Sequence, residues 1–398
     1  MAFIFPKITP PDNTNEKDWL DWKWQLKNAI KTKEDLEAQI PLLKEELDFF
    51  KSYKSSGFKF QITPYSLEVL KQKDTTRVLR KILIGDFSEY SEQKQAQLDP
   101  LNERQNNPAP RVIHRYSDRA LFLVTDFCSV YCRYCTRKHF TAKDQVFPSA
   151  SEYDQAMDYF RTHKGIKEVI LSGGDPLTLS DDRIIKVISD LRSISHIEII
   201  RIGTRIPVVM PMRITEDLVN KLKAFHPVYI MTHFNHPDEL TEDAKSALSL
   251  LVDNGFPVFN QMVFLNGVNN EASLIQALNR RLTYLRVKPY YMFQCDPSEG
   301  TDHLRTSIQD SLGIQKELWG HMSGLSMANL SVDIPSGGGK AYFVPNFVES
   351  QNENEILFKG WDGVSEKYIN PNSINLKKPV VDDSYKKEWS EILNSKFL

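Results

Sequence analysis

Between residues 120 and 293 the sequence alternates between short apolar runs and amphipathic stretches, and this alternation constrains the fold more than any other feature. Six runs are apolar almost throughout, and most are followed by a turn signal and a helical stretch. Strands of this kind are typical of a parallel sheet covered by helices. The predicted strands are Ala120–Thr125, Glu168–Leu171, Ile197–Ile202, Val228–Thr232, Val258–Leu265 and Pro289–Phe293, and the predicted helices lie near 151–163, 181–194, 215–225, 240–254 and 271–285.

Six strand–helix units are fewer than the eight of a closed barrel. We therefore predict an α/β fold built on a partial, open (βα)6 barrel at residues 111–305. Residues 1–110 are predicted to form an N-terminal helical region and a linker. Residues 306–398 are predicted to form a C-terminal extension and tail.

The N-terminal region carries two helix signals. Trp19, Trp22 and Leu26 have the spacing of one helical face, which predicts core packing. Thr63 before Pro64 is typical of a helix start, because proline fits the first helical position.

Polar residues follow five of the six predicted strands. Because ligands bind at the carboxyl ends of parallel strands, we expect these residues to converge on one site. The segments are Asp126 with the cysteines after it, Ser172-Gly-Gly-Asp-Pro176, Gly203-Thr-Arg205, His233-Phe-Asn-His236 and Cys295-Asp-Pro297.

Three of the four cysteines lie close together, as Cys128, Cys132 and Cys135 in a C-x3-C-x2-C spacing. Iron–sulfur clusters are held by cysteine thiolates, and a cubane held by three of them leaves one iron open to another ligand. A structural zinc site would need a second ligand pair, which Cys295 alone does not provide. The alternative is three small buried side chains that hold no metal.

Two glycine-rich segments lack side chains where a backbone can approach a ligand. The first, Ser172-Gly173-Gly174-Asp175-Pro176, is also compatible with an ordinary turn. The second, Ser336-Gly337-Gly338-Gly339-Lys340, exposes N–H groups that suit a phosphate, and its lysine can form a Schiff base with pyridoxal phosphate (PLP). Its alternative is a flexible surface loop. Arg115 and Arg119 suit a phosphate or carboxylate, or form a surface ion-pair cluster.

The cysteine motif, with Tyr131 and Tyr134 beside it, resembles the cluster motif of radical S-adenosylmethionine (SAM) enzymes. With the other motifs, in this order, the sequence resembles the lysine 2,3-aminomutase family over about residues 16–350. The remaining matching segments are Asp18-Trp-Leu-Asp-Trp-Lys-Trp24, Asp99-Pro-Leu101, His114-Arg-Tyr116, Gly173-Gly-Asp-Pro176, Arg201-Ile-Gly-Thr-Arg-Ile-Pro207, Thr232-His-Phe-Asn-His-Pro237, Gly267-Val-Asn269 and Gly337-Gly-Gly-Lys340.

The resemblance implies three cofactors and a radical SAM partial barrel with a PLP-binding extension. Lys340 would carry PLP as an internal aldimine. A 5′-deoxyadenosyl radical formed from SAM would start the transfer of the α-amino group from C2 to C3. The implied ligand sets are Cys128, Cys132 and Cys135 for a [4Fe–4S] cluster; Gly173, Gly174, Asp175, His233 and Gln261 for SAM; and Arg115, Arg119, Gly337, Gly338, Gly339 and Lys340 for PLP.

The resemblance also implies a substrate. Arg137 would bind the carboxylate of the substrate, and Asp296 and Asp333 would bind the distal ammonium of lysine. Two buried carboxylates are costly without a cation, so such a site rejects substrates that lack one. L-Lysine is therefore the predicted substrate and β-lysine the product. Arginine, ornithine or glutamate, and a lysine isomerase that serves translation-factor modification, are the alternatives.

The sequence departs from the family pattern in its zinc site. Well-known members carry zinc-binding cysteines after the Gly-Val-Asn segment and near the C-terminus, whereas no cysteine follows Cys295 here. Zinc is therefore not expected. A homo-oligomer is possible without it.

Composition narrows the range of partners. A net charge of −2 gives no general attraction to nucleic acid, and no apolar run approaches membrane-spanning length. We expect a cytoplasmic protein that acts on a small amino acid and receives electrons from a donor such as flavodoxin or ferredoxin. The competing hypotheses are a non-catalytic iron–sulfur redox protein and a zinc-binding regulator that uses His233 and His236.

Overall fold

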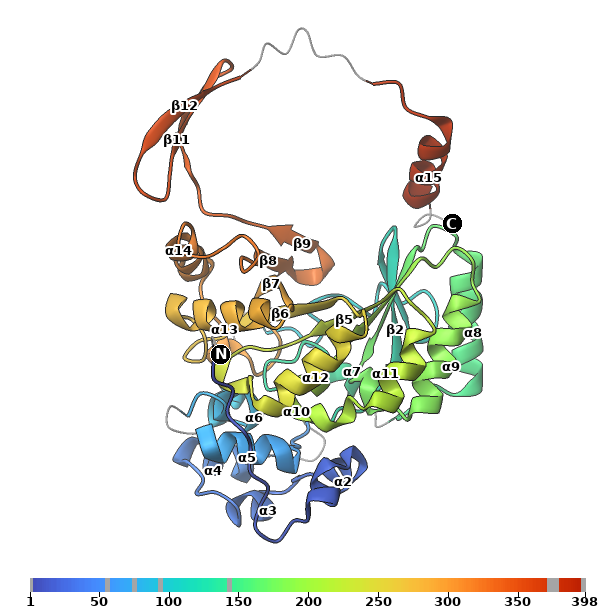
Figure 1. The fold of residues 1–398 in the computed structure, drawn as a ribbon, viewed down its shortest axis with the longest axis vertical. Helices are drawn as coiled ribbons and strands as arrows, with labels where there is room; N and C mark the ends of the chain where they lie inside the picture. The colour runs from blue at the N-terminus through green and yellow to red at the C-terminus, as the bar shows by residue number, and fades with distance from the viewer. Residues whose placement is uncertain are drawn as a thin grey trace.

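The computed structural model describes residues 3–53, 58–73, 77–91, 96–141, 145–370 and 379–394. Parts of the predicted tail, at 371–378 and 395–398, lie outside the described residues. Figure 1 shows a curved sheet with helices along its outer side, a group of N-terminal helices beneath it, and C-terminal segments that extend away from it.

The six predicted strands are confirmed and form neighbouring parallel strands of one sheet. Their order in the sheet follows their order in the sequence, from β2 to β7. Each strand feeds a helix that packs back on the sheet, so consecutive strands become neighbours. Their bounds are β2 (Arg119–Thr125), β3 (Glu168–Gly173), β4 (Ile199–Gly203), β5 (Val228–Thr232), β6 (Val258–Phe264) and β7 (Lys288–Gln294).

The five predicted helices are also confirmed, each within a few residues. Three of them begin at a hydroxyl side chain, Ser149, Thr215 or Thr241, that accepts a hydrogen bond from a backbone N–H of the first turn. Their bounds are α8 (Ala150–Thr162), α9 (Asp181–Arg192), α11 (Glu216–Lys223), α12 (Glu242–Asp253) and α13 (Ala272–Tyr284). Two shorter helices, α7 (Lys138–Thr141) and α10 (Ile206–Val209), lie in the segments after β2 and β4.

The sheet continues past the six predicted strands at both edges. After α14 (Ile308–Leu318), β8 (Asn329–Ile334) joins β7 in parallel, and β9 (Gly339–Tyr342) pairs antiparallel with β8. At the other edge, β1 (Val112–Tyr116) pairs antiparallel with β2. Sequence reasoning missed β8, whose apolar residues alternate with polar ones instead of forming the continuous run by which the six predicted strands were recognised.

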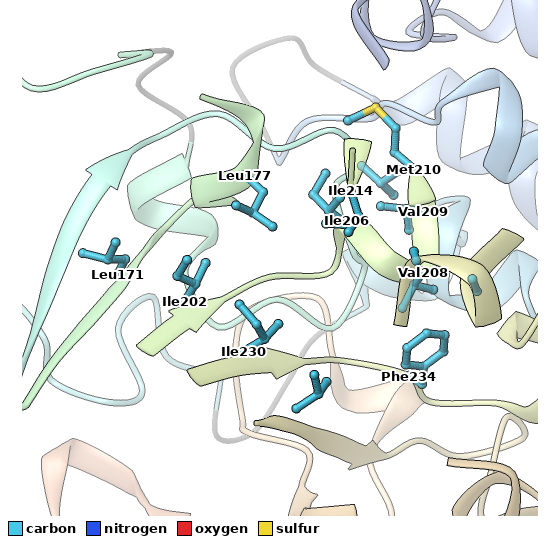
Figure 2. Packing of buried hydrophobic residues seen from close by; sticks show 14 of the residues in the cluster. Leu171, Leu177, Ile202, Ile206, Val208, Val209, Met210, Ile214, Ile230 and Phe234 are labelled. Atoms are coloured by element: carbon cyan, nitrogen blue, oxygen red, sulfur yellow. The ribbon is translucent and has the colours of Figure 1, made fainter. Parts of the chain in front are cut away.

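A row of branched aliphatic residues crosses the centre of the sheet. Leu171 lies opposite Ile202, and Ile202 lies opposite Ile230, so that three adjacent strands contribute to one layer. All three are fully buried. Figure 2 shows them beside the segment after β4, which adds Ile206 and Val209. Burial of each such side chain stabilises the fold by roughly 1.5–3 kcal/mol, so this layer holds the strand ends in place.

The N-terminal region is helical, as predicted, but its helices are short. The expected single face of Trp19, Trp22 and Leu26 is wrong, because the helix breaks at Asp21, whose side chain caps the next helix. Trp19 is nevertheless buried. The helices are α1 (Glu16–Leu20), α2 (Trp22–Lys27), α3 (Lys33–Glu37), α4 (Lys44–Ser52), α5 (Pro64–Lys73) and α6 (Arg80–Leu83).

This region supports the loops that follow the strands. The side chain of Gln61 donates to the carbonyl oxygens of Cys128 at 3.1 Å and Ser129 at 3.0 Å. Thr63 caps the predicted helix start at Pro64, and its hydroxyl also donates to Val209 O at 2.7 Å. The segment before α5 therefore holds the cysteine loop through Gln61 and the segment after β4 through Thr63.

The C-terminal part forms a second, three-stranded antiparallel sheet of β10 (Val348–Gln351), β11 (Glu355–Lys359) and β12 (Ser365–Ile369), followed by α15 (Asp383–Asn394). Figure 1 shows this sheet and α15 in red, away from the centre of the barrel. Within the described ranges, none of the helices has both the length and the apolar character needed to cross a membrane.

Candidate active site

A cavity of about 800 Å³ runs along the inner face of the sheet. The predicted convergence is confirmed, because residues from the segments after β2, β3, β4, β5 and β7 all line it. Gly338 is the exception among the predicted site residues, all of which are described, because it does not line the cavity. The predicted residues that line the cavity are Arg115, Arg119, Cys128, Cys132, Cys135, Arg137, Gly173, Gly174, Asp175, His233, Gln261, Asp296, Asp333, Gly337, Gly339 and Lys340.

The three cysteines lie near one another in the loop after β2. Burial, and then its neighbour Cys135, raise the pKa of Cys128; burial and Cys132 raise the pKa of Cys135 to about 11. A bound metal would favour the thiolates by replacing their protons. Within the described residues no three His, Cys, Asp or Glu side chains converge on a single ion. A cubane presents a separate iron to each thiolate, so it does not require such convergence.

Two donors are directed at these sulfurs. The backbone N–H of Arg137 donates to Cys135 Sγ at 3.3 Å, and Arg205 Nη1 donates to Cys132 Sγ at 2.9 Å. Hydrogen-bond donors of this kind stabilise thiolates and tune a cluster. Arg205 was present in the predicted turn after the third strand, but sequence reasoning gave it no role.

Gly173, the last residue of β3, and Gly174 after it serve a close packing that we did not predict. Gly173 has a φ of +114°, and a Cβ there would lie 2.2 Å from Thr125 O. A Cβ on Gly174 would lie 2.2 Å from Phe127 O. These glycines let the turn pack directly on the backbone at the end of β2 and the start of the cysteine loop. The close approach that requires glycine here is therefore between two parts of the protein and not between the protein and a ligand.

Asp175 joins two of the turns that surround the cavity. One carboxylate oxygen accepts from Leu177 N at 3.0 Å and Thr204 Oγ1 at 2.7 Å, and the other accepts from Arg205 N at 2.7 Å. Asp175 is buried, and these bonds offset the cost of its charge. It therefore positions the turn after β4 relative to the turn after β3.

His233 and Gln261 both line the cavity. The imidazole of His233 stacks on Tyr134, with ring centroids 5.4 Å apart. Burial, and then the charge of Arg205, lower the pKa of His233 to about 3, so the ring is neutral at physiological pH. Its Nε2 atom is buried and has no hydrogen-bond partner among the described residues, which leaves it available to a ligand.

Lys340 and the two predicted aspartates meet at another part of the cavity. Lys340 Nζ lies 3.1 Å from Asp333 Oδ1 and 5.0 Å from the ring centroid of Phe293. Burial, and then the neighbouring Asp333, raise the pKa of Asp296 to about 7. The arrangement is a small acidic pocket that holds one ammonium group.

The glycine loop closes against β1. A Cβ on Gly337 would lie 3.2 Å from Arg115 Nη1, and a Cβ on Gly339 would lie 3.3 Å from Arg115 Nη2. Arg115 Nε is buried without a hydrogen-bond partner among the described residues. Tyr116 Oη accepts a hydrogen bond from Lys340 N at 3.0 Å. Loop amides and a guanidinium whose Nε has no partner among the described residues form a cradle that suits an anion.

Arg119 lies at the edge of this cradle. Its guanidinium stacks on Tyr116, 4.0 Å from the ring centroid, and pairs with Asp118 at 2.7 Å.

Arg137 is held by a buried partner that the sequence did not reveal. Glu103 accepts from Arg137 Nη2 at 2.7 Å and from Nε at 3.0 Å, and Ser172 accepts from Nη1 at 3.1 Å. Glu103 lies in an irregular loop without periodicity, so no local pattern marks it. The pair fixes the direction in which the guanidinium faces the cavity.

A partial parallel barrel with this cysteine loop defines a radical SAM enzyme. The family model of the radical SAM superfamily matches residues 122–277 of the sequence. Members of that superfamily use SAM and a [4Fe–4S] cluster. A second family model, that of lysine-2,3-aminomutase, matches residues 315–396. The chain belongs to the lysine 2,3-aminomutase family, a family of isomerases, as its sequence motifs predicted.

The similarity to individual relatives covers most of each chain. The L-lysine 2,3-aminomutase of Clostridium subterminale is 42% identical over 90% of this chain and 86% of the relative. That of Fusobacterium nucleatum is 38% identical over 98% and 90%. The glutamate 2,3-aminomutase of Clostridioides difficile is 37% identical over 95% and 89%. Among solved structures, Streptococcus suis SuiB bound to S-adenosylmethionine has a TM-score of 0.41 at 12% identity, over 55% of this chain and 51% of that one.

Proposed function

We propose that this chain moves the α-amino group of L-lysine from C2 to C3 and so produces β-lysine, using a [4Fe–4S] cluster, SAM and PLP. The observation that carries the proposal is the meeting of Asp296, Asp333 and Lys340 in the cavity that also contains the cysteine loop. Such a cavity can hold a diamino acid next to both a radical source and an amine-binding lysine.

The residues present fit the cofactors. The cluster fits Cys128, Cys132 and Cys135, since their thiols share one loop; Cys135 accepts a hydrogen bond from a backbone N–H and Cys132 accepts one from a guanidinium. When bound, the cluster and SAM supply a carbon radical that removes a hydrogen atom, and PLP supplies a carbonyl that holds an amine and spreads an unpaired electron. His233 and Gln261, with the backbone of Gly173 and Gly174, would lie around SAM.

PLP fits the cradle between the glycine loop and β1. Arg115 and the amides of Gly337 and Gly339 would hold its phosphate, with Arg119 at the edge, and Lys340 would provide the amine that binds it. The unpaired Nε of Arg115 is the feature that supports an anion there.

The chain's own residues orient the substrate. Arg137, steadied by Glu103, would hold the α-carboxylate, and Asp296 and Asp333 would hold the distal ammonium. Lys340 occupies Asp333 in this structure, so its commitment to PLP would free that carboxylate for the substrate cation. Glutamate fits less well, because its side-chain carboxylate would face two acidic groups. Arginine and ornithine carry a suitable cation and remain the nearest competitors.

The test is anaerobic product analysis. The protein is reconstituted with iron, sulfide and PLP and is given SAM, a chemical reductant and L-lysine, and β-lysine is measured by mass spectrometry. We expect β-lysine with lysine and none when SAM is omitted. Cleavage of SAM without β-lysine would overturn the substrate, and arginine, ornithine and glutamate would be tried next. A fully loaded cluster that neither binds nor cleaves SAM would overturn the reaction.

The physiological electron donor is proposed to be a low-potential one-electron carrier, such as a flavodoxin or ferredoxin, because a cluster of this kind must be reduced before SAM is cleaved. The substrate is a small molecule, and location in the cytoplasm is proposed because reduced thiols persist there.

A further inference from the structure

Arg205 connects the cysteine loop to a buried carboxylate. Its Nη1 donates to Cys132 Sγ at 2.9 Å, and its Nη2 donates to Glu239 Oε1 at 2.5 Å. Both side chains are almost completely buried, with 9% of Arg205 and 4% of Glu239 exposed. The charges of a buried ion pair interact strongly with neighbouring groups, because little water screens them.

The pair is rigidly placed from both sides. The backbone N–H of Arg205 donates to Asp175 Oδ2 at 2.7 Å, which fixes the turn after β4. The second oxygen of Glu239 accepts from Asn235 N at 2.6 Å and His236 N at 3.0 Å, which fixes the turn after β5. The guanidinium is thus held against the sulfur by three loops at the carboxyl ends of the strands.

A hydrogen bond and a positive charge at a cluster sulfur favour the reduced cluster, which carries one more negative charge. Glu239 opposes this effect, since its negative charge neutralises part of the guanidinium. Lys340 and Arg137 also carry positive charge in the cavity, and the neutral side chain of Tyr134 also bonds to Cys132. Among the described residues, Arg205 is the cationic side chain that donates a hydrogen bond to a motif cysteine.

We propose that Arg205, held by Glu239, is a positioning residue that sets the reduction potential of the cluster. The inference rests on the proposed function, because it requires a [4Fe–4S] cluster on Cys132. One electron from a low-potential donor converts the oxidised cluster to the reduced cluster, and Arg205 makes that step easier by stabilising the added charge. No bond in the protein forms or breaks.

The experiment measures the midpoint potential of the reconstituted protein without SAM, in a redox titration followed by the EPR signal of the reduced cluster. Arg205→Gln removes the positive charge and should move the midpoint potential to a more negative value. Glu239→Gln removes the opposing charge and should move it to a more positive value. Arg205→Lys keeps the charge and should move it less than Arg205→Gln.

Lys316→Gln is the matched control, because it removes one positive charge from an exposed site on α14, and it should leave the potential unchanged. Iron and sulfide per chain are measured for each variant, so that loading and tuning are separated. If Arg205→Gln fails to fold, the opposite shift of Glu239→Gln still decides the question.

Shifts of the same sign in Arg205→Gln and Glu239→Gln, or unchanged potentials in fully loaded variants, would overturn the role of Arg205 and leave the proposed function intact. A wild-type protein that assembles no [4Fe–4S] cluster would instead overturn the proposed function, and this inference with it.

Discussion

Lys340 Nζ lies 3.1 Å from Asp333 Oδ1 and 3.2 Å from Oδ2, because the two residues face each other across the β8–β9 pair. Antiparallel pairing brings directly opposite side chains within reach. The lysine proposed to bind PLP and the aspartate proposed to bind the substrate therefore satisfy one another in this structure. Loading of the cofactor and opening of the cation site are expected to be one event.

The first prediction concerns Lys340. Lys340→Ala should abolish the visible absorbance of bound PLP after reconstitution and desalting, because no amine would remain at the cradle to form a Schiff base. Lys316→Ala, on the exposed surface of α14, is the control and should retain the band. A full band in Lys340→Ala would assign the cofactor to another lysine.

The second prediction is a pH dependence. The pKa of Asp296 is raised to about 7 by burial and by Asp333, so this carboxyl is largely neutral below pH 7 and ionised above it. A cation binds the ionised form, so KM for lysine should fall as pH rises from 6 to 8 and then level off. The change approaches about tenfold per pH unit on the acid side.

Asp296→Asn is the test of that assignment. It should raise KM across the range and flatten its dependence on pH, because the amide does not titrate. A variant that keeps the slope of the wild-type protein would place the titrating group elsewhere.

The third prediction compares two glycines. Gly173→Ala should lower the free energy of unfolding by at least about 2 kcal/mol, because its φ is +114° and the new Cβ would meet Thr125 O. Gly313→Ala, inside α14 and with no atom within 4 Å of the new Cβ, should raise it by about 0.5–1 kcal/mol. Urea denaturation of both variants measures the difference, and equal effects would show that the turn after β3 can relax.

The fourth prediction concerns a buried ion pair in the N-terminal region. Arg80 Nη2 lies 2.5 Å from Glu46 Oε2, and the two side chains are 4% and 6% exposed. Glu46→Ala leaves the guanidinium buried without this carboxylate and should cost about 3–5 kcal/mol. The unfolding of the N-terminal helices, followed by tryptophan fluorescence in urea, measures the effect.

Lys51→Ala is the control for that experiment, because it removes an exposed ion pair with Asp48 on the same helix. Surface pairs contribute little, so the unfolding midpoint should stay close to that of the wild-type protein. A similar loss in both variants would mean that charge on α4, rather than burial of the pair, sets its stability.

Most of the barrel could be predicted from the sequence, because strands buried on both faces leave continuous apolar runs and helices leave periodic ones. The strand β8, which lies between β7 and β9, was not predicted: its residues alternate between polar and apolar and do not form the continuous run that marks the other parallel strands. The break at Asp21 was missed for a related reason, since the spacing of Trp19, Trp22 and Leu26 fits a helix while a single capping hydrogen bond ends it.

The residues of the site also divide into those that the sequence predicted and those that only the structure revealed. The sequence by itself determined the cysteine motif, the glycine loop with Lys340, the family and the rule that polar strand ends meet. Tertiary structure alone decided that Glu103 holds Arg137 and that Arg205 meets Cys132, pairs that are 34 and 73 residues apart in the sequence. The physical reason is that a local pattern records which way a side chain faces along its own strand or helix, whereas its partner is chosen by the packing of separate loops at one end of the barrel.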